Sequence, residues 1–153
     1  MDIFRARGLS MAIDRQFIGY RMTPFEVVVD AERVQRFSEA IGAPTDTLTP
    51  GVAAPTFLKV VEGEGNSSRR LLEVLGVDLK RVLHAEQEFE FGSPVRAGDR
   101  LTVERAVSDI YDRKAGSLEF VIVDSTIRSV SGQWVGRSLQ SLLIRNPRAA
   151  TSP

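Results

Sequence analysis

The feature that most constrains the fold is a change of pattern in the middle of the chain. From residue 82 onward, apolar and polar residues alternate in four runs, at 82–91, 100–112, 117–130 and 134–145. Alternation with a period of two predicts strands that bury one face. Short segments rich in Gly, Asp and Ser separate the runs, and they favour tight turns between antiparallel strands. The second half of the chain is therefore predicted to form an antiparallel meander of four strands.

The first half of the chain has helical patterns instead. Asp30 is a favourable N-cap, and apolar residues follow it at helical spacing until Gly42. A second segment has the same pattern, with Asn66 or Ser67 as its cap and Gly76 as its stop. The elements predicted before the meander are a strand at 24–30, a helix at 31–42, a loop at 43–55, a short helix at 56–63 and a helix at 67–76.

This order of elements predicts the fold class. Helices that precede an antiparallel meander indicate an α+β fold in which the sheet packs on a helix. The last strands have roughly 12 residues against a usual 5 or 6, and such strands suit a curved antiparallel sheet wrapped around a central helix. That arrangement is the hot-dog fold. The expected organisation is a flexible N-terminal extension at 1–12, a single hot-dog domain at 13–147 and a C-terminal tail at 148–153.

Charge and composition exclude several classes of function. Twenty basic and 20 acidic residues cancel, so neither nucleic acid nor a membrane surface is expected as a partner. The chain has no cysteine and one histidine, which excludes thiolate catalysis and leaves too few ligands for a zinc site. No metal and no cofactor are expected. Apolar runs fall short of the roughly 18 residues needed to cross a bilayer, and no signal-peptide pattern begins the sequence, so a cytoplasmic location is expected.

The stretch HAEQEFEFGSPVRAGDRL, at 84–101, resembles a known family pattern. It is similar to the MaoC-like, or (R)-specific enoyl hydratase and hydroxyacyl dehydratase, family, which has His-x-x-Gln-x-Phe, then Pro, then Gly-Asp and Leu. The likeness is closest to the N-terminal, non-catalytic type of dehydratase module. The stretch APTF at 54–57 resembles the Ala-Pro-Pro-Thr-Phe of that family, with one Pro missing. The positions that match the first pattern are His84, Gln87, Phe89, Pro94, Gly98, Asp99 and Leu101.

The resemblance implies a function as well as a fold. Members of this family handle acyl thioesters of coenzyme A or acyl carrier protein, and active members add water reversibly to 2-enoyl groups. Two hot-dog units pair side by side, and the acyl chain enters a tunnel between them. The expected partner is therefore a second copy in a homodimer or a catalytic hot-dog subunit in a heterodimer.

The loop at 43–55 departs from the family pattern at the catalytic position. Hydration of an enoyl thioester needs a base and an acid, and active members supply an Asp and a His from a motif like Asp-x-Asn-Pro-x-His. The loop here has Asp46 but neither Asn-Pro nor His, and it is several residues shorter. Asp46 is the candidate for the catalytic Asp, and its alternative role is that of a turn residue.

His84 is the second candidate catalytic residue. Strict alternation along the strand puts His84 on one face with three glutamates and puts Gln87 on the apolar face. His84 would then contact the partner subunit or the thioester, or simply be exposed to solvent. A buried Gln87 needs a hydrogen-bond partner, and the favoured one is the loop at 54–56, with the substrate thioester as the alternative.

Further candidates for substrate binding lie on the helical segments. Within APTF, Thr56 is a candidate substrate-binding residue, and Phe57 is a candidate for the wall of an acyl tunnel, although an apolar residue there is core by default. Arg69 and Arg70 open the second helix, where positive charge opposes the helix dipole. This mismatch suggests phosphate groups of coenzyme A as partners, and the alternative is a pair of ordinary surface arginines.

Three functions are compatible with these residues. The first is a hot-dog subunit that shapes the acyl tunnel while a catalytic partner supplies Asp and His. The second is a self-sufficient homodimeric hydro-lyase that uses Asp46 and His84 across the interface. The third is a binding module without chemistry or a thioesterase, for which Glu62 or Glu64 would be the carboxylate. Fold alone does not choose between them.

Overall fold

The computed structural model describes residues 12–43 and 49–147. Short 3-10 helices alternate with α-helices in the first half, and strands fill the second half. The elements in chain order are η1 (Arg15–Phe17), β1 (Phe25–Val28), α1 (Ala31–Ala40), η2 (Pro55–Phe57), α2 (Leu58–Glu62), η3 (Glu64–Asn66), α3 (Ser67–Val74), η4 (Leu79–Arg81), β2 (Val82–Phe91), β3 (Arg100–Arg113), β4 (Leu118–Ser129) and β5 (Trp134–Arg145).

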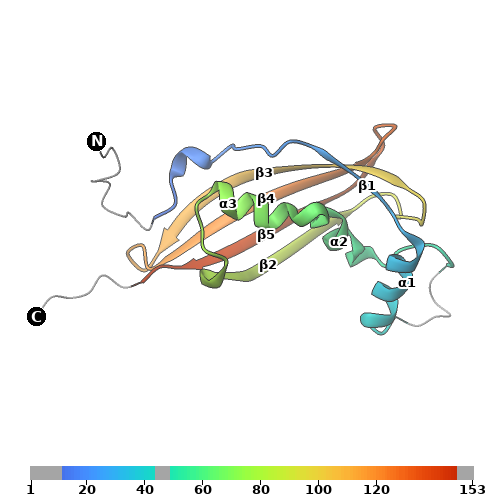
Figure 1. Cartoon of the computed structure of the whole chain (residues 1–153), viewed down its shortest axis with the longest axis horizontal. Helices are drawn as coiled ribbons and strands as arrows, with labels where there is room; N and C mark the ends of the chain where they lie inside the picture. The colour runs from blue at the N-terminus through green and yellow to red at the C-terminus, as the bar shows by residue number, and fades with distance from the viewer. Residues whose placement is uncertain (1–11, 44–48, 148–153) are drawn as a thin grey trace, which may run out of the picture.

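The strands form one curved antiparallel sheet in the order β1-β3-β4-β5-β2. Helices α2 and α3 lie end to end across one face of this sheet, and α1 projects beyond its end (Figure 1). All four strands predicted from alternation are present, and the α+β fold with a curved sheet around a central helix is confirmed. Strands β3, β4 and β5 have 12 to 14 residues each, which is long for a globular protein.

The start of α1 follows the sequence prediction. The carboxylate of Asp30 accepts a hydrogen bond of 2.9 Å from the backbone N–H of Arg33, as an N-cap does. The start of α3 differs from the prediction. Asn66 occupies the N-cap position with a left-handed φ of 55° and gives no side-chain cap, because its backbone forms a sharp break between α2 and α3. Ser67 instead donates its hydroxyl to the carbonyl of Glu62.

The face of the sheet that meets the helices has two apolar clusters with a polar layer between them. Val103 of β3 and Ile127 of β4 belong to the first cluster, together with residues of α1 and α2. Val107 and Val123, each two inward-facing positions away on the same strands, belong to the second cluster with α3. The layer that separates the clusters holds Arg105, Ser125, Ser138 and Gln140, each at most 4% exposed.

The segment before β1 continues the edge of the sheet. The backbone N–H of Gly19 donates to Val107 at 2.8 Å, and that of Met22 donates to Arg105 at 2.9 Å. Further back, the N–H of Ile13 donates to the buried carboxylate of Glu119. Residues 13–22 are thus held against β3 and β4 ahead of the first predicted strand. Within the described residues, no helix combines the length and apolar character needed to cross a membrane.

Candidate functional site

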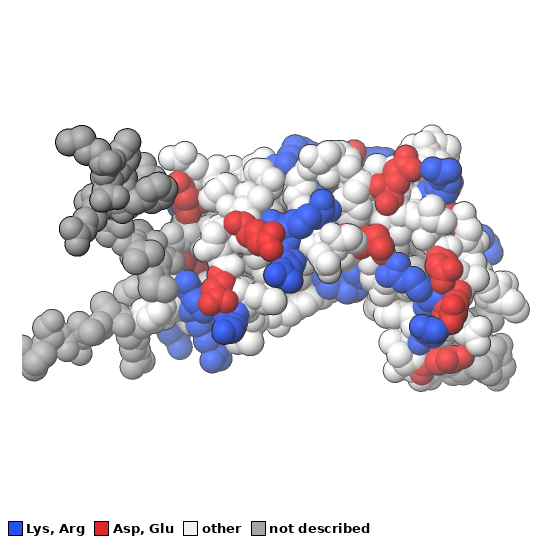
Figure 2. Space-filling view, in the orientation of Figure 1, with Lys and Arg blue, Asp and Glu red and all other residues white. Residues whose placement is uncertain are grey.

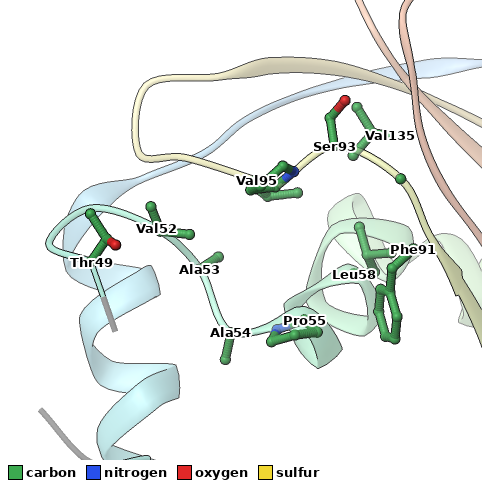
Figure 3. Close-up of a pocket in the computed structure, with 12 residues that line it drawn as sticks. Thr49, Val52, Ala53, Ala54, Pro55, Leu58, Phe91, Ser93, Val95 and Val135 are labelled. Carbon is green, nitrogen blue, oxygen red and sulfur yellow. The ribbon is translucent and has the colours of Figure 1, made fainter. Parts of the chain in front are cut away.

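The candidate site is a pocket at the start of the central helix. It has a volume of about 320 Å³ and lies between the segment that leads into α2 and the segment that follows β2. Figure 3 shows side chains of both segments around the same space. Its apolar wall includes Val52, Ala54, Leu58, Phe91, Val95 and Val135.

Backbone hydrogen bonds fix the two walls of the pocket relative to each other. The N–H of Ala53 donates to the carbonyl of Val95 at 2.8 Å, and the N–H of Ala97 donates to Gly51 at 2.7 Å. On the other side, the N–H of Gly92 donates to Val135 at 2.9 Å. Because backbone atoms make these contacts, the shape of the pocket depends little on side-chain rotamers.

Two glycines permit the close packing around the pocket. A Cβ atom at Gly92 would lie 2.5 Å from the ring of Trp134, so the indole can rest on the backbone there. A Cβ at Gly136 would lie 2.7 Å from Leu58 and 2.8 Å from the carbonyl oxygen of Glu90. Helix α2 therefore sits directly on the backbone of β5, a contact that only glycine allows.

The lining of the pocket has little chemistry of its own. Among its described residues, the polar side chains are the hydroxyls of Thr49 and Ser93, and none carries a titratable group. An ordinary hydroxyl is neither a base nor an acid near neutral pH. The described lining is thus suited to hold an apolar group and to orient a polar end, but it cannot transfer protons.

A buried network of polar side chains lies at the other end of α2, around Arg105. This side chain is 2% exposed and donates to the hydroxyls of Ser125 at 3.1 Å and Ser67 at 2.7 Å. It also donates to the carbonyl of Glu62 at 3.3 Å and to the amide oxygen of Gln140 at 3.2 Å. Burial lowers the pKa of Arg105, and the charge of Glu62 opposes that effect. The guanidinium therefore holds together the break in the central helix.

Glu62 and Glu64 are poorly placed to activate water in the pocket. The side chain of Glu62 is fully buried and forms an ion pair with Lys59. Its second oxygen, Oε2, is buried without a hydrogen-bond donor among the described residues. Glu64 pairs with Arg33 at 2.6 Å. Neither glutamate lines the pocket, and this placement gives no support to the thioesterase alternative.

Of the two candidate catalytic residues, the structure describes only His84. Asp46 lies outside the described residues, in the segment 44–48 next to Thr49 of the pocket. His84 is exposed, and its Nε2 lies 3.1 Å from the carbonyl oxygen of Glu86. It stands seven positions before Phe91 on β2, which corresponds to roughly 23 Å along an extended strand. His84 is thus remote from the pocket of its own chain.

A bulge in β2 corrects the predicted faces of that strand. His84 pairs with Leu142, but the register shifts, and Glu86 pairs with Ser141 and Gln87 with Gln140. Cross-strand partners share a face, so His84 lies on the helix-facing side with Gln87, while the three glutamates lie on the outer side. The prediction that His84 shares a face with them is wrong, because a bulge changes the alternation by one residue.

Gln87 makes its hydrogen bonds to β5 rather than to the loop at 54–56. Its amide nitrogen donates to the hydroxyl of Ser138 at 2.5 Å and to the carbonyl of Leu139 at 3.4 Å. Its amide oxygen is buried and has no donor among the described residues. None of its hydrogen bonds in the described structure goes to residues 54–56, so the favoured role of pinning the loop is wrong.

Of the remaining candidates, Thr56 is exposed at the helix start, and Phe57 is 3% exposed. The ring of Phe57 packs edge-on against Phe37 at 5.5 Å, which is a core position rather than the wall of the pocket. Arg69 is exposed and pairs with Glu73 at 3.1 Å, and Arg70 lies over the ring of Phe25. Figure 2 shows basic and acidic side chains next to each other over the helix layer.

Two features of the structure were not predicted from the sequence, the buried network around Arg105 and the pocket. Arg105 follows Leu101 and Val103 on the apolar face of β3 and precedes Val107. An arginine on a buried face indicates an internal polar network. The Gly and Pro after Phe91 indicate where β2 ends. No local pattern, however, predicts that the segment after β2 lies against residues 52–55.

Comparison with known proteins then identifies the family. A family model described as FAS1-like, dehydratase domain region, matches residues 16–137. The chain belongs to this dehydratase family. A UPF0336 protein of Streptomyces avermitilis is 30% identical over 147 residues, which cover 88% of this chain and 97% of that protein.

Solved structures agree with this dehydratase assignment. A chain of the HadBC (3R-hydroxyacyl-ACP dehydratase) complex of Mycobacterium tuberculosis matches this structure with a TM-score of 0.68 and 19% sequence identity. The match covers 83% of this chain and 96% of that chain. A MaoC-like dehydratase from Rhodospirillum rubrum has a TM-score of 0.60 at 22% identity, covering 85% and 94%. These similarities establish the hot-dog fold, and with the family model they confirm the MaoC-like resemblance.

Proposed function

We propose that this chain is the acyl-binding subunit of a hot-dog hydratase or dehydratase that acts on 2-enoyl thioesters. It holds the acyl group in the pocket at the start of α2, and a second hot-dog subunit supplies the Asp and His. The carrier of the acyl group is coenzyme A or acyl carrier protein. The observation that carries the proposal is the apolar pocket whose described lining has no titratable side chain.

The division of labour follows from the reaction. Hydration forms a bond between the oxygen of water and the β-carbon, while one proton of the water goes to a base and another proton is delivered to the α-carbon. An apolar pocket orients the chain and excludes bulk water from it. The proton transfers then need groups from elsewhere. The HadBC dehydratase, whose chain is similar in fold, was solved as a complex, and this supports a paired arrangement here.

Trp134 gives a direct assay for binding to the pocket. It is the only tryptophan of the chain, and its ring rests on Gly92, which lines the pocket. Titration with a hexanoyl-CoA analogue that cannot react should change the tryptophan emission and saturate. Free coenzyme A at the same concentrations serves as the control for contributions from the carrier alone.

Phe91→Ala tests whether the pocket is the acyl site. Phe91 is 53% exposed and lines the pocket, so its truncation removes apolar surface without opening the core. Loss of about 1 to 2 kcal/mol of contact should weaken acyl-CoA binding about tenfold. Leu79→Ala is the matched control, because Leu79 is 60% exposed but lies outside the pocket lining. Equal effects of both variants would contradict the assignment.

Turnover distinguishes the proposal from its main alternative. Hydration of crotonyl-CoA, followed by loss of enoyl-thioester absorbance, should be undetectable with the folded chain alone. Turnover by the chain alone that is abolished in both Asp46→Asn and His84→Ala would favour the self-sufficient homodimer. Release of free thiol from acyl-CoA would favour a thioesterase instead.

A further inference from the structure

The two edges of the sheet are treated differently by the fold. On the β3 side, β1 covers the edge between Phe25 and Val28. Beyond β1, Gly19 and Met22 donate to carbonyls of β3, and Tyr20 accepts from the N–H of Val107 at 2.9 Å. On this side the sheet therefore ends in a strand of only four residues, and the backbone of β3 next to it pairs with residues 19–22, so little regular strand is offered to another chain.

The other edge, β2, is open. Strand β2 has ten residues and pairs on one side with β5, while no described strand pairs with its other side. Leu83 is 44% exposed and Phe91 is 53% exposed at its two ends. A long open edge with exposed apolar side chains is a template for another strand. The proposed function requires a second hot-dog subunit, and this edge is where a further strand would continue the sheet.

The outer face of β2 carries a row of acidic side chains. Glu86, Glu88 and Glu90 lie on this face, and all three are exposed. Glu90 forms an ion pair with Arg137 at 3.0 Å. Glu86 and Glu88 have no ion-pair partner in the described part of the chain. The edge therefore presents two uncompensated carboxylates, two positions apart, to an incoming strand.

A second copy of the same chain fits this edge poorly. In a symmetric dimer with its two-fold axis perpendicular to the sheet, β2 pairs with an antiparallel copy of itself that has the same face outward. Residues opposite each other in this pair lie on the same face. A register centred on Glu88 places it against its own copy and places Glu86 against Glu90. A register centred on Gln87 places Glu86 against Glu88. Both arrangements place carboxylates opposite carboxylates. His84 cannot pair with them because the bulge puts it on the other face of the strand.

We propose that β2 pairs with the edge strand of a different hot-dog subunit, whose facing residues include two Lys or Arg side chains spaced two positions apart. The same carboxylates that disfavour a homodimer then become the specificity determinant for the partner. This inference rests on the proposed function for the existence of a hot-dog partner. It adds the chemistry by which that partner is selected.

A charge-reversed form of the chain provides a surrogate partner of known shape. The variant Glu86→Lys/Glu88→Lys has the same fold with a basic edge, and circular dichroism and thermal unfolding verify that it folds. In sedimentation at about 0.1 M ionic strength, the wild type alone and the variant alone should each be monomeric, and their mixture should form a 1:1 dimer. The Kd of the mixture should be at least tenfold lower than that of either self-association, and about 1 M salt should remove this difference.

The control variant reverses two carboxylates elsewhere. Glu26→Lys/Glu104→Lys makes the same change of net charge on β1 and β3, where both side chains are exposed, and its mixture with wild type should show no gain. A wild type that dimerises as tightly as the mixture, or a control that assembles equally well, would overturn the proposal. Because the readout is assembly, a failure here is distinct from the absence of acyl binding, which would refute the proposed function.

Discussion

The two ends of helix α2 differ in chemistry. At its start, around Ala54 and Leu58, the helix faces an apolar pocket with no titratable side chain in the described lining. At its end, between Glu62 and Ser67, the helix breaks, and the buried guanidinium of Arg105 binds both sides of the break. One end of α2 is open and apolar, and the other is closed and polar.

This difference shows that buried charge need not mark the reactive site. The guanidinium of Arg105 binds backbone and side-chain groups of the helix break, and it is not part of the pocket lining. Titratable groups with shifted pKa values in a cleft are a common indicator of an active site, but the pKa of Arg105 is lowered by burial away from the pocket, and the charge of Glu62 opposes this effect. The open end has the shape of a binding site, and no titratable side chain is part of its described lining.

The largest effect is expected from breaking the closed end with Arg105→Met. The substitution leaves Lys59 as the one cation beside the buried carboxylate of Glu62 among the described residues, and it leaves the carbonyl of Glu62 and the hydroxyl of Ser67 without the donor that Arg105 supplies. Removal of one partner of a buried ionic network destabilises by about 3–5 kcal/mol, measured by urea unfolding. The double variant Arg105→Met/Glu62→Leu should recover much of the loss, since apolar pairs replace buried ion pairs well. A single variant as stable as wild type would contradict this structural role.

At the open end, Gly136→Ala should force the helix away from the sheet. The added methyl would collide with Leu58 and with the carbonyl oxygen of Glu90. Overpacking of this kind costs about 1–3 kcal/mol, and thermal unfolding measures it. Ser117→Ala is the control. Ser117 is half-buried in the β3–β4 turn, and the change removes only a hydrogen bond to the carbonyl of Lys114, so it should cost less. Acyl-CoA binding should also weaken in Gly136→Ala, because Leu58 lines the pocket.

A smaller effect on ligand binding is expected from replacing the two arginines at the start of α3. These arginines belong to neither the pocket nor the Arg105 network. If Arg69 and Arg70 bind the phosphates of coenzyme A, then Arg69→Ala/Arg70→Ala should weaken CoA-thioester binding about three- to tenfold, since exposed charge pairs contribute about 0–1 kcal/mol each. Binding of the corresponding pantetheine thioester should not change. Equal weakening for both ligands would indicate a structural effect instead.

The smallest effect is expected from His84→Ala. His84 is exposed and remote from the pocket of its own chain, so its loss should change stability by less than about 0.5 kcal/mol. The emission change of Trp134 with acyl-CoA should give the same Kd as wild type. A Kd that rises tenfold would show that His84 reaches a bound ligand and would restore it as a site residue.

The fold was accessible from sequence because its signals are local. Alternation identified β2 to β5, and Asp30 identified the start of α1, since period and capping depend on neighbouring residues alone. The bulge in β2 was not accessible, because nothing in the residues around Ala85 distinguishes a bulged strand from a regular one. The faces of His84 and Gln87 were interpreted from strict alternation, and one extra residue was enough to change the result for His84.

The site was less accessible than the fold. The pocket forms where residues 52–55 meet residues 91–95, and only the tertiary structure brings these segments together. Phe57 was a reasonable tunnel residue by sequence, but its side chain turns to Phe37 in the core. The missing His of the loop was evident from sequence, since it needs only a comparison of motifs, and the lining of the pocket agrees with it.

The contacts of Glu119 bring the beginning and the end of the described chain to one carboxylate. The N–H of Ile13 reaches it at 3.1 Å, and the side-chain amide of Asn146 reaches it at 2.7 Å. The chain before η1 and the end of β5 lie at the end of the sheet opposite α1 (Figure 1). A circular permutant that joins these two residues by a short linker, with new ends at the turn before Gln133, should therefore keep both the fold and the acyl pocket.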